Sequence, residues 1–177
     1  GRQAFVVCPR IGGPGQGSGD RGGEEMIGAE EMHARLAAGE LSGLRLGLLH
    51  GRQSAELKAA TMEDFAAGEL DVLVSTTIIE VGLDVPNASA MVVLDADRFG
   101  VSQLHQLRGR IGRGAHPGIC LLVSAVDPRT PAAQRLRDVA ATRDGFALAE
   151  LDLAQRREGD VLGAEQSGGR SSLRLLR

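Results

Sequence analysis

Aromatic residues are almost absent from this chain of 177 residues, which contains no tryptophan, no tyrosine and four phenylalanines. A hydrophobic core must therefore consist mainly of leucine, valine, isoleucine and alanine. Lysine is also nearly absent, because Lys58 is the only one and the remaining basic charge is arginine. A Walker A phosphate-binding loop requires a Gly-Lys-Ser/Thr sequence, and none occurs in this chain. The sequence thus excludes a Walker A site within these residues.

The chain contains only two cysteines, Cys8 and Cys120, and each lies in an apolar run typical of a strand. Isolated cysteines in such runs are usually small buried residues, so they predict no disulfide framework. The four histidines have no zinc-ligand spacing with them, so we expect no metal site. No apolar run is long enough to cross a membrane and no signal peptide opens the chain, so we expect a cytoplasmic protein without membrane contact.

The net charge of −3 does not by itself indicate a nucleic-acid-binding protein. Any contact with nucleic acid must come from a local patch or from another part of a longer protein. The sequence starts without methionine and almost directly on an apolar run, and we interpret it as a fragment of a larger protein. Its length fits one domain with an appendage.

Short apolar runs predict five buried strands, separated by helical patterns and turns. The runs cover residues 4–9, 44–51, 71–77, 90–95 and 119–123. Strands that alternate with helices are typical of parallel βα units, so we predict an α/β fold with a parallel sheet flanked by helices. Helices are predicted over residues 24–38, from the N-cap Ser54 to Gly68, and over residues 131–143. The inward face of the second helix is predicted to contain Leu57, Met62 and Phe65.

A glycine-rich segment covers residues 12–23. It lacks lysine and is followed by the acidic residues Glu24 and Glu25, which would repel phosphate. We therefore expect a disordered surface loop and no phosphate cradle.

Gln103 to Arg113 reads Gln-Leu-His-Gln-Leu-Arg-Gly-Arg-Ile-Gly-Arg. On a helix at about 100° per residue, Gln103, Gln106, Arg110 and Arg113 would share one narrow face. An apolar stripe of Leu104, Leu107 and Ile111 would adjoin it. Arginine matches phosphate oxygens and stays charged, so a nucleoside triphosphate is the candidate ligand. A solvated helix end is the alternative, but two amides and two helix-disfavouring glycines in the same register make it the weaker one.

Residues 75–84, Ser-Thr-Thr-Ile-Ile-Glu-Val-Gly-Leu-Asp, follow a predicted strand at the sheet edge where α/β proteins bind ligands. The hydroxyls of Thr76 and Thr77 can bind DNA phosphate. Gly82 allows close approach of the backbone to a nucleotide, and Asp84 can accept from a ribose or orient an arginine. The alternative is that Thr76 and Asp84 only cap a short helix and a turn.

These strings resemble the motifs of superfamily-two helicases and translocases. Residues 106–113 resemble motif VI, residues 75–84 motif V, and residues 4–9 motif IV. His50-Gly51-Arg52 resembles motif IVa and is equally typical of a turn at the end of a strand. The longer string over residues 103–114 is similar to the RecG family of bacterial DNA translocases. That resemblance implies a RecA-like second motor domain over residues 1–126, in which Arg110 and Arg113 act as arginine fingers on ATP.

Residues 127–177 resemble the TRG motif, a helical translocation hairpin shared by the RecG family and the transcription-repair coupling factor. The resemblance implies that Arg135, Arg156 and Gln166 couple motion of the motor to DNA. The family pattern Arg-Gly-Pro-Gly is replaced here by Arg156-Arg157-Glu158-Gly159, so the turn of the hairpin departs from that pattern.

The resemblance implies an ATP-driven double-stranded DNA translocase or helicase that remodels branched DNA such as stalled forks and Holliday junctions. The Walker motifs and the Mg²⁺ ligands would lie on a first motor domain outside this chain, so we expect the isolated chain to be inactive. The implied partners are branched DNA, the first RecA-like domain and a wedge domain of the same protein, and single-stranded DNA-binding protein. The alternatives are the motor of the coupling factor and a non-enzymatic domain with a helicase fold. Residues 50–52, Val81 and Gly114 favour the RecG family.

Overall fold

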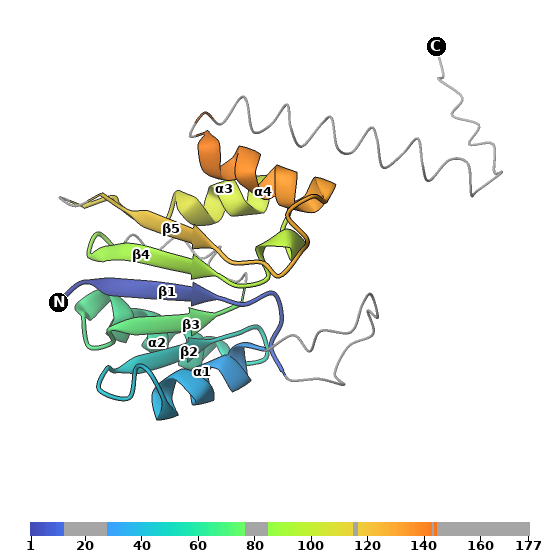
Figure 1. Cartoon of the computed structure of the whole chain (residues 1–177). Coiled ribbons are helices and arrows are strands. Elements are labelled where there is room, and N and C mark those ends of the chain that lie inside the picture. The colour runs from blue at the N-terminus through green and yellow to red at the C-terminus, as the bar shows by residue number, and fades with distance from the viewer. Residues whose placement is uncertain (13–27, 77–84, 115–116, 143, 145–177) are drawn as a thin grey trace, which may run out of the picture.

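A computed structural model describes residues 1–12, 28–76, 85–114, 117–142 and 144, which form a five-stranded sheet flanked by helices (Figure 1). The strands are β1 (Gln3–Val7), β2 (Leu46–Leu49), β3 (Val72–Ser75), β4 (Ala88–Val93) and β5 (Ile119–Leu122). Their order is β2-β3-β1-β4-β5 and every neighbouring pair is parallel. The predicted parallel α/β fold and its five strands are confirmed.

Helices cover both faces of the sheet, but unequally. They are α1 (Ala29–Ala38), α2 (Ala55–Ala67), α3 (Val101–Arg108) and α4 (Pro131–Ala141), with a 3₁₀ turn η1 (Ala96–Arg98) after β4. Residues of α2, α3 and α4 share one apolar cluster with β1, β3 and β4, and α1 packs over the opposite face. Figure 1 shows α1 beside β2 and β3, with α3 and α4 near β5.

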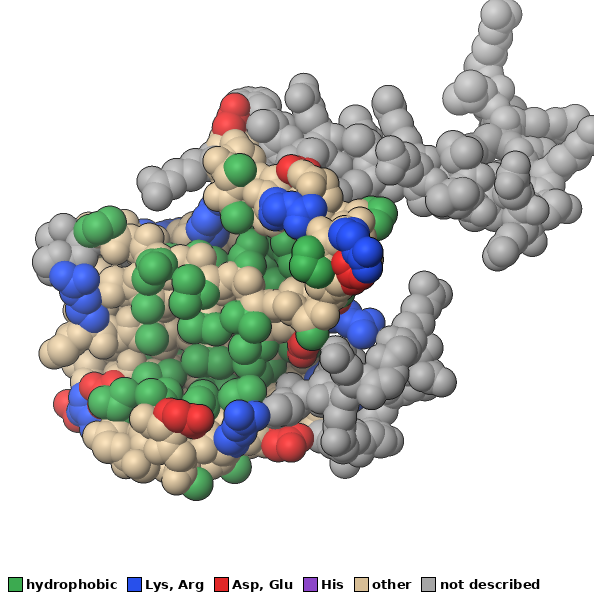
Figure 2. All heavy atoms as spheres, viewed as in Figure 1, with side chains coloured by type: hydrophobic (Ala, Val, Ile, Leu, Met, Phe, Trp, Pro, Cys, Tyr) green, Lys and Arg blue, Asp and Glu red, His purple; other side chains and the backbone are tan. Residues whose placement is uncertain are grey.

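On the face of the sheet where α1 packs, the part formed by β4 and β5 has exposed apolar side chains. Among the described residues, the outward side chains of the edge strand and its exit, Ile119, Leu121 and Val123, are 56%, 49% and 46% exposed. Figure 2 shows green apolar side chains spread over the sheet between α1 and α4.

The boundaries of α2 follow from its caps. The hydroxyl of Ser54 accepts from the Leu57 backbone N–H at 3.2 Å, and Gly68 ends the helix with a φ of 80°. Both caps were predicted from the sequence, because serine favours the N-cap and glycine tolerates the left-handed conformation. The prediction that Leu57 faces inward is wrong, since its side chain is exposed. At about 100° per residue it lies well off the face that Met62 and Phe65 bury.

The amino ends of the strands are held by a closed set of polar contacts. Gln3 is buried, and its Nε2 donates to the carbonyl oxygens of Phe65 at 2.5 Å and Leu70 at 2.8 Å. Its Oε1 accepts from Asn87 Nδ2 at 3.2 Å. These bonds join the start of β1 to the segment before β3 and to the start of β4.

At the same end, the Arg45 guanidinium binds the Asp71 carboxylate through two N–H groups, Nη2 to Oδ1 at 2.9 Å and Nε to Oδ2 at 3.0 Å. Nη2 also donates to the carbonyl of Gly68 at 2.7 Å. The hydrogen bonds from Arg45 lower the pKa of Asp71 to about 2. Bidentate pairs of this kind fix geometry as well as charge, and this one sets the entry of β2 beside that of β3.

Candidate functional site

The carboxyl ends of β2 and β3 bring His50 and Thr76 together. Leu49 pairs with Ser75 in the parallel register, and the Thr76 backbone N–H donates to the carbonyl of Leu49 at 3.2 Å. His50 and Thr76 are therefore the next residues along two adjacent strands, and both are buried. On the other side of β3, the Cys8 N–H donates to the carbonyl of Ser75 at 2.8 Å. His50, from the segment that resembles motif IVa, and Thr76, a predicted DNA contact, thus lie at the same end of the sheet.

Buried polar atoms at this edge lack hydrogen-bond partners within the described part of the chain. They are Nδ1 of His50, Oγ of Ser75 and Oγ1 of Thr76. An unsatisfied buried donor or acceptor costs about 1–3 kcal/mol, and folded proteins leave few of them. Nδ1 of His50 and Oγ1 of Thr76, on two neighbouring strand ends, are candidate partners for a hydrogen-bonding ligand. Ser75 lies on the opposite face of the sheet from Thr76, because side chains alternate along β3. Ser75 was not singled out from the sequence, although it is the first polar residue after the apolar run of β3.

The segment after β2 forms a turn that the side chain of Gln53 closes. The His50 backbone N–H donates to Gln53 Oε1 at 2.9 Å, and Gln53 Nε2 donates to the carbonyl of Leu48 at 3.1 Å. The Gln53 N–H also donates to the carbonyl of His50 at 3.2 Å. Residues 50–53 therefore form a turn at the end of a strand, as one of the two sequence interpretations predicts. That turn fixes the backbone of His50 at the edge described above.

The helix α3 carries the first half of the arginine-rich stretch. Gln103 lies in its first turn, where its Oε1 accepts from the backbone N–H of Gly100 at 3.0 Å and so caps the helix. The predicted apolar stripe is confirmed for Leu104 and Leu107, which are buried on α3, whereas Ile111 is buried beyond the end of the helix. Gln106 is exposed on the same helix.

The helix ends at Arg108, so the prediction that Arg110 and Arg113 continue its polar face is wrong. Gly112 has a φ of 70°, and its N–H donates to the carbonyl of Ala88 at 3.2 Å. A Cβ on Gly112 would lie 2.5 Å from the nitrogen of Gly118. Gly112 and Gly118 thus let two backbone segments cross closely, which a continuous helix through Gly112 would prevent.

Arg110 and Arg113 consequently lie on the segment that leaves α3. Arg110 is partly exposed and Arg113 is exposed. Arg113 Nε donates to the carbonyl of Gly109 at 2.7 Å, which folds the side chain back over the end of the helix. Neither residue is buried, as an arginine acting on a ligand held by another domain requires.

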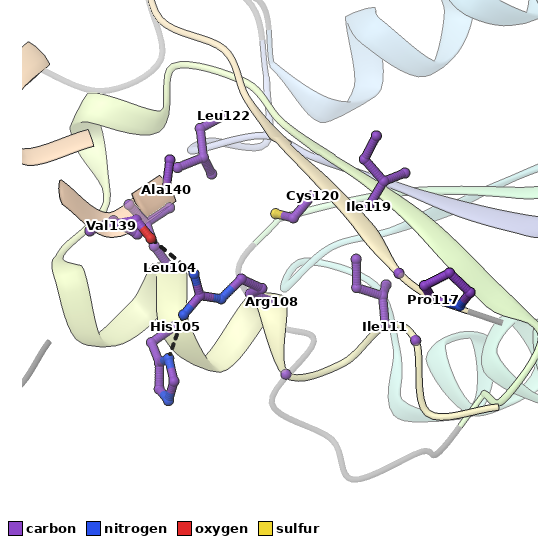
Figure 3. Close-up of a pocket in the computed structure, with 13 residues that line it drawn as sticks. Leu104, His105, Arg108, Ile111, Pro117, Ile119, Cys120, Leu122, Val139 and Ala140 are labelled. Carbon is purple, nitrogen blue, oxygen red and sulfur yellow. Dashed lines mark hydrogen bonds between the residues drawn. The ribbon is translucent and has the colours of Figure 1, made fainter. Parts of the chain in front are cut away.

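Arg108, which lies between Gln106 and Arg110, binds the end of α4. Its Nη1 donates to the carbonyl of Val139 at 2.9 Å (Figure 3). The same atom donates to the carbonyl of Thr142 at 2.6 Å, at the end of α4. Its Nη2 lies 3.2 Å from Nδ1 of His105. A cation at a helix C-terminus satisfies carbonyls that have no partner within the helix. Sequence reasoning missed this role, because no local pattern reveals a partner thirty residues away.

Arg135, predicted as a coupling residue, ties α4 to the turn after β4. Its Nη2 donates to the carbonyl of Asp97 at 2.6 Å, and its Nε is buried with no partner in the described part of the chain. Arg108 and Arg135 together bind α4 to α3 and to η1.

A hollow of about 510 Å³ lies between α3, the end of α4 and β5 (Figure 3). Its lining combines apolar side chains, such as Leu104 and Val139, with Arg108, His105 and the backbone of three glycines. Cys120 lines it, and burial raises the pKa of that thiol despite the opposing effect of Arg108. Burial also raises the pKa of Cys8, to about 12. Neither cysteine is therefore activated as a nucleophile.

Several predicted residues lie outside the described part of the chain. They are Thr77, Gly82, Asp84, Arg156 and Gln166, together with residues 13–23 of the glycine-rich segment. The described residues contain no group of three or more His, Cys, Asp or Glu side chains that could hold a metal ion. Among the helices that the structure describes, none has the length and apolar character needed to cross a bilayer.

The family model of the helicase conserved C-terminal domain matches residues 23–115. The ATP-dependent DNA helicase RecG of Mycobacterium tuberculosis is 62% identical over 176 residues, which cover 99% of this chain and 24% of that protein. RecG of Bacillus subtilis is 43% identical over 169 residues, which cover 95% of this chain and 24% of that protein. The chain spans about a quarter of the length of these curated relatives.

Solved structures give the same fold. A structure of RecG bound to a three-way DNA junction has a TM-score of 0.67 and 45% identity, and the match covers 86% of this chain and 18% of that one. Dbp5 of S. cerevisiae bound to RNA and ADP BeF3 has a TM-score of 0.56 and 16% identity, covering 79% of this chain and 32% of that one. The second likeness shows the fold alone. The predicted RecA-like fold is therefore confirmed.

Proposed function

Because this chain belongs to the family of the helicase conserved C-terminal domain, we propose that it is the second motor domain of an ATP-driven translocase of the RecG type. The longer protein would remodel branched double-stranded DNA, including stalled forks and Holliday junctions. The relatives named RecG and the RecG structure bound to a three-way DNA junction support this proposal over the transcription-repair coupling factor.

The observation that carries the proposal is the set of unpartnered polar atoms at the carboxyl ends of β2 and β3. Hydroxyl groups and backbone N–H groups are common donors to DNA phosphate, and they fix register without reading sequence. We assign DNA-backbone contacts to His50 and Thr76, and we extend them to Thr77 from the sequence. Such a local set of polar groups is compatible with a chain whose net charge is −3.

The nucleotide side of the proposal rests on Arg110 and Arg113. Both lie on the surface segment beyond α3, from which they would reach ATP bound by the first motor domain. Arginine fingers contribute on the order of 10³–10⁵ in rate in phosphoryl transfer. Gln106, Gly82 and Asp84 would complete this side of the nucleotide site.

The longer protein would supply the parts of the ATP site that this chain lacks. The described residues offer no cluster of carboxylates for Mg²⁺, so we assign its ligands to the first motor domain. That domain, a wedge domain and single-stranded DNA-binding protein are the proposed protein partners. We place the longer protein in the cytoplasm.

Coupling between ATP and DNA would pass through the arginines around α4. Arg108 adjoins the segment of Arg110 and holds the end of α4, so a displacement of that segment would pull on the helix. Arg135 would pass the same displacement to η1. Arg156 and Gln166 extend this chain of coupling residues in the proposal, with residues 127–177 forming the translocation hairpin.

The test compares Arg110→Ala and Arg113→Ala in the longer protein with Arg129→Ala, a matched surface control. Arg129 is 89% exposed in its side chain and binds Asp127 on its own turn. We expect each of the first two variants to lower ATPase turnover at least about 100-fold while DNA affinity is retained. The control should match wild type. Near-wild-type turnover in both Arg110→Ala and Arg113→Ala would contradict the nucleotide assignment.

A further inference from the structure

His50 has a second contact whose purpose the turn of residues 50–53 does not explain. Its Nε2 lies 3.3 Å from Oε1 of Glu30, a residue in the first turn of α1. The side chain of His50 is 9% exposed and that of Glu30 is 46% exposed. A carboxylate that reaches from the surface to a buried ring thus joins α1 to the end of β2.

The backbone of α1 holds Glu30 in place. The Ala29 N–H donates to the carbonyl of Arg10 at 2.9 Å, and the Glu30 N–H donates to the carbonyl of Ile11 at 3.0 Å. The start of α1 is therefore attached to the exit of β1. Glu30 reaches from that attachment to His50, which is itself held by Gln53. The pair links the exits of two strands that lie on either side of β3.

The contact determines which nitrogen of the ring carries a proton. An ionised carboxylate only accepts hydrogen bonds, so Nε2 must carry the hydrogen that faces Glu30. The other nitrogen, Nδ1, is buried and has no partner within the described residues. The two nitrogens of an imidazole point in divergent directions, so Nδ1 faces away from Glu30. The partner of one ring nitrogen thereby fixes the role of the other.

We propose that Glu30 is a positioning residue for DNA binding, which fixes the orientation and the Nε2 proton of His50 so that Nδ1 is the nitrogen on the DNA side. This inference rests on the proposed function, since it assumes that DNA lies at the carboxyl ends of β2 and β3. Nδ1 is buried, so contact with DNA requires a small opening at this end of the sheet. A bridging water can then donate one hydrogen to Nδ1 and the other to a phosphate oxygen.

The sign of the effect of Glu30 on DNA affinity separates positioning from plain electrostatics. DNA is an anion, so a carboxylate that acts only through its charge weakens binding, and its removal tightens binding. A carboxylate that positions a DNA ligand does the opposite. Glu31 is the matched control, because it adjoins Glu30, lies in the same first turn and is exposed.

The experiment measures the dissociation constant for a three-way DNA junction in the longer protein, with melting temperature on the same preparations. Glu30→Ala and Glu30→Asp should each weaken binding by about fivefold, the latter because it keeps the charge but loses reach. Glu30→Gln retains an acceptor for Nε2–H and should stay within about twofold of wild type. Glu31→Ala should bind as well as wild type or slightly better. The melting temperatures of all four should agree closely.

Nitrogen-15 NMR of the histidine rings in this chain gives a readout that does not involve DNA. His50 should be the Nε2–H tautomer in the wild type and in Glu30→Gln, and a mixture in Glu30→Ala. Unchanged tautomer populations in Glu30→Ala, or tighter DNA binding by that variant, would overturn the positioning role. Equal weakening by Glu30→Gln and Glu30→Ala would overturn it too.

His50→Ala distinguishes failure of this inference from failure of the proposed function. If that variant binds the junction like wild type, DNA does not use this edge, and the assignment of the DNA site falls together with the inference. If His50→Ala weakens binding while Glu30→Ala does not, the DNA site stands and only the role of Glu30 is overturned.

Discussion

The two ends of the parallel sheet differ in how their buried polar side chains are hydrogen-bonded. At the amino end, the side-chain amide of Gln3 has partners for both its nitrogen and its oxygen, and Arg45 and Asp71 form a bidentate pair. At the carboxyl end, buried polar atoms of His50 and Thr76 have no partner in the described part of the chain. Polar side chains are therefore satisfied at the amino end, whereas the carboxyl end has hydrogen-bonding groups left for a ligand.

The difference separates residues that hold the fold from residues that serve a ligand. A satisfied buried network gains stability and uniqueness, whereas unsatisfied buried groups cost stability that a ligand can restore. In open α/β sheets, ligands bind beyond the carboxyl ends of the strands. The unpartnered polar atoms thus point independently to the end of the sheet where the segments that resemble motifs IVa and V begin.

The largest effect on stability should come from Gln3→Leu. The substitution keeps the size of the side chain but leaves the carbonyls of Phe65 and Leu70 without their donor. We expect unfolding free energy to fall by on the order of 3 kcal/mol, measured by urea denaturation of this chain. DNA affinity of the longer protein below its melting temperature should be unchanged. A loss below about 0.5 kcal/mol would show that the amino end does not depend on this network.

Arg108→Gln tests a residue that holds the fold and also adjoins the proposed nucleotide-binding arginines. Arg108 makes hydrogen bonds to the end of α4, and Arg110 lies two residues after it. The variant should lose its hold on the end of α4 and lower the unfolding free energy by about 1–2 kcal/mol. In the longer protein, junction unwinding should fall more than ATPase turnover, since no nucleotide contact is removed. Arg137→Gln, on the exposed side of α4, is the control. Parallel loss of ATPase and unwinding would argue against a coupling role.

Thr76→Val should have a small effect on stability and a larger one on DNA. The variant removes an unpartnered buried hydroxyl, so the unfolding free energy should stay the same or rise by up to about 1 kcal/mol. Affinity for a three-way junction should fall about fivefold in the longer protein, because a phosphate donor is lost. A destabilised variant with normal DNA affinity would show that Thr76 supports the fold and does not bind DNA.

The smallest effect concerns acid stability. The folded pKa of Asp71 is about 2 and lies below its ordinary value of 3.8, because Arg45 donates to the carboxylate. The charged form therefore stabilises the fold at all pH values above about 4, and that contribution is lost as the pH falls towards 2. Asp71→Asn should melt slightly below wild type at neutral pH, and the difference should shrink to zero between about pH 4 and pH 2. A constant difference across that range would exclude the ion pair as its cause.

Periodicity and caps predicted much of this fold from the sequence. The apolar runs identified all five strands, and Ser54 and Gly68 marked the ends of α2 because their preferences are local. Helix periodicity failed after Arg108, where Gly112 adopts a left-handed φ to cross Gly118. That crossing depends on two segments meeting in space, which no single window of sequence reports.

The site was predicted in part, for the same reason. His50, Thr76 and Arg135 were identified through motifs that lie at strand ends or in a helical tail. The contacts of Glu30 and Arg108 were not predicted, because their partners His50 and Val139 lie about twenty to thirty residues away in the sequence. Tertiary contacts of this kind emerge only once the sheet order places the elements side by side.

Residue-resolved hydrogen exchange on the longer protein, with and without a three-way DNA junction, tests the contrast between the two ends most directly. The account predicts that DNA slows exchange of the backbone amides of His50, Gln53 and Thr76, at the carboxyl end. It predicts no change for the amides of Gln3, Arg45 and Asp71, at the amino end. Protection confined to the amino end, or equal at both ends, would contradict the assignment of DNA to the carboxyl end of the sheet.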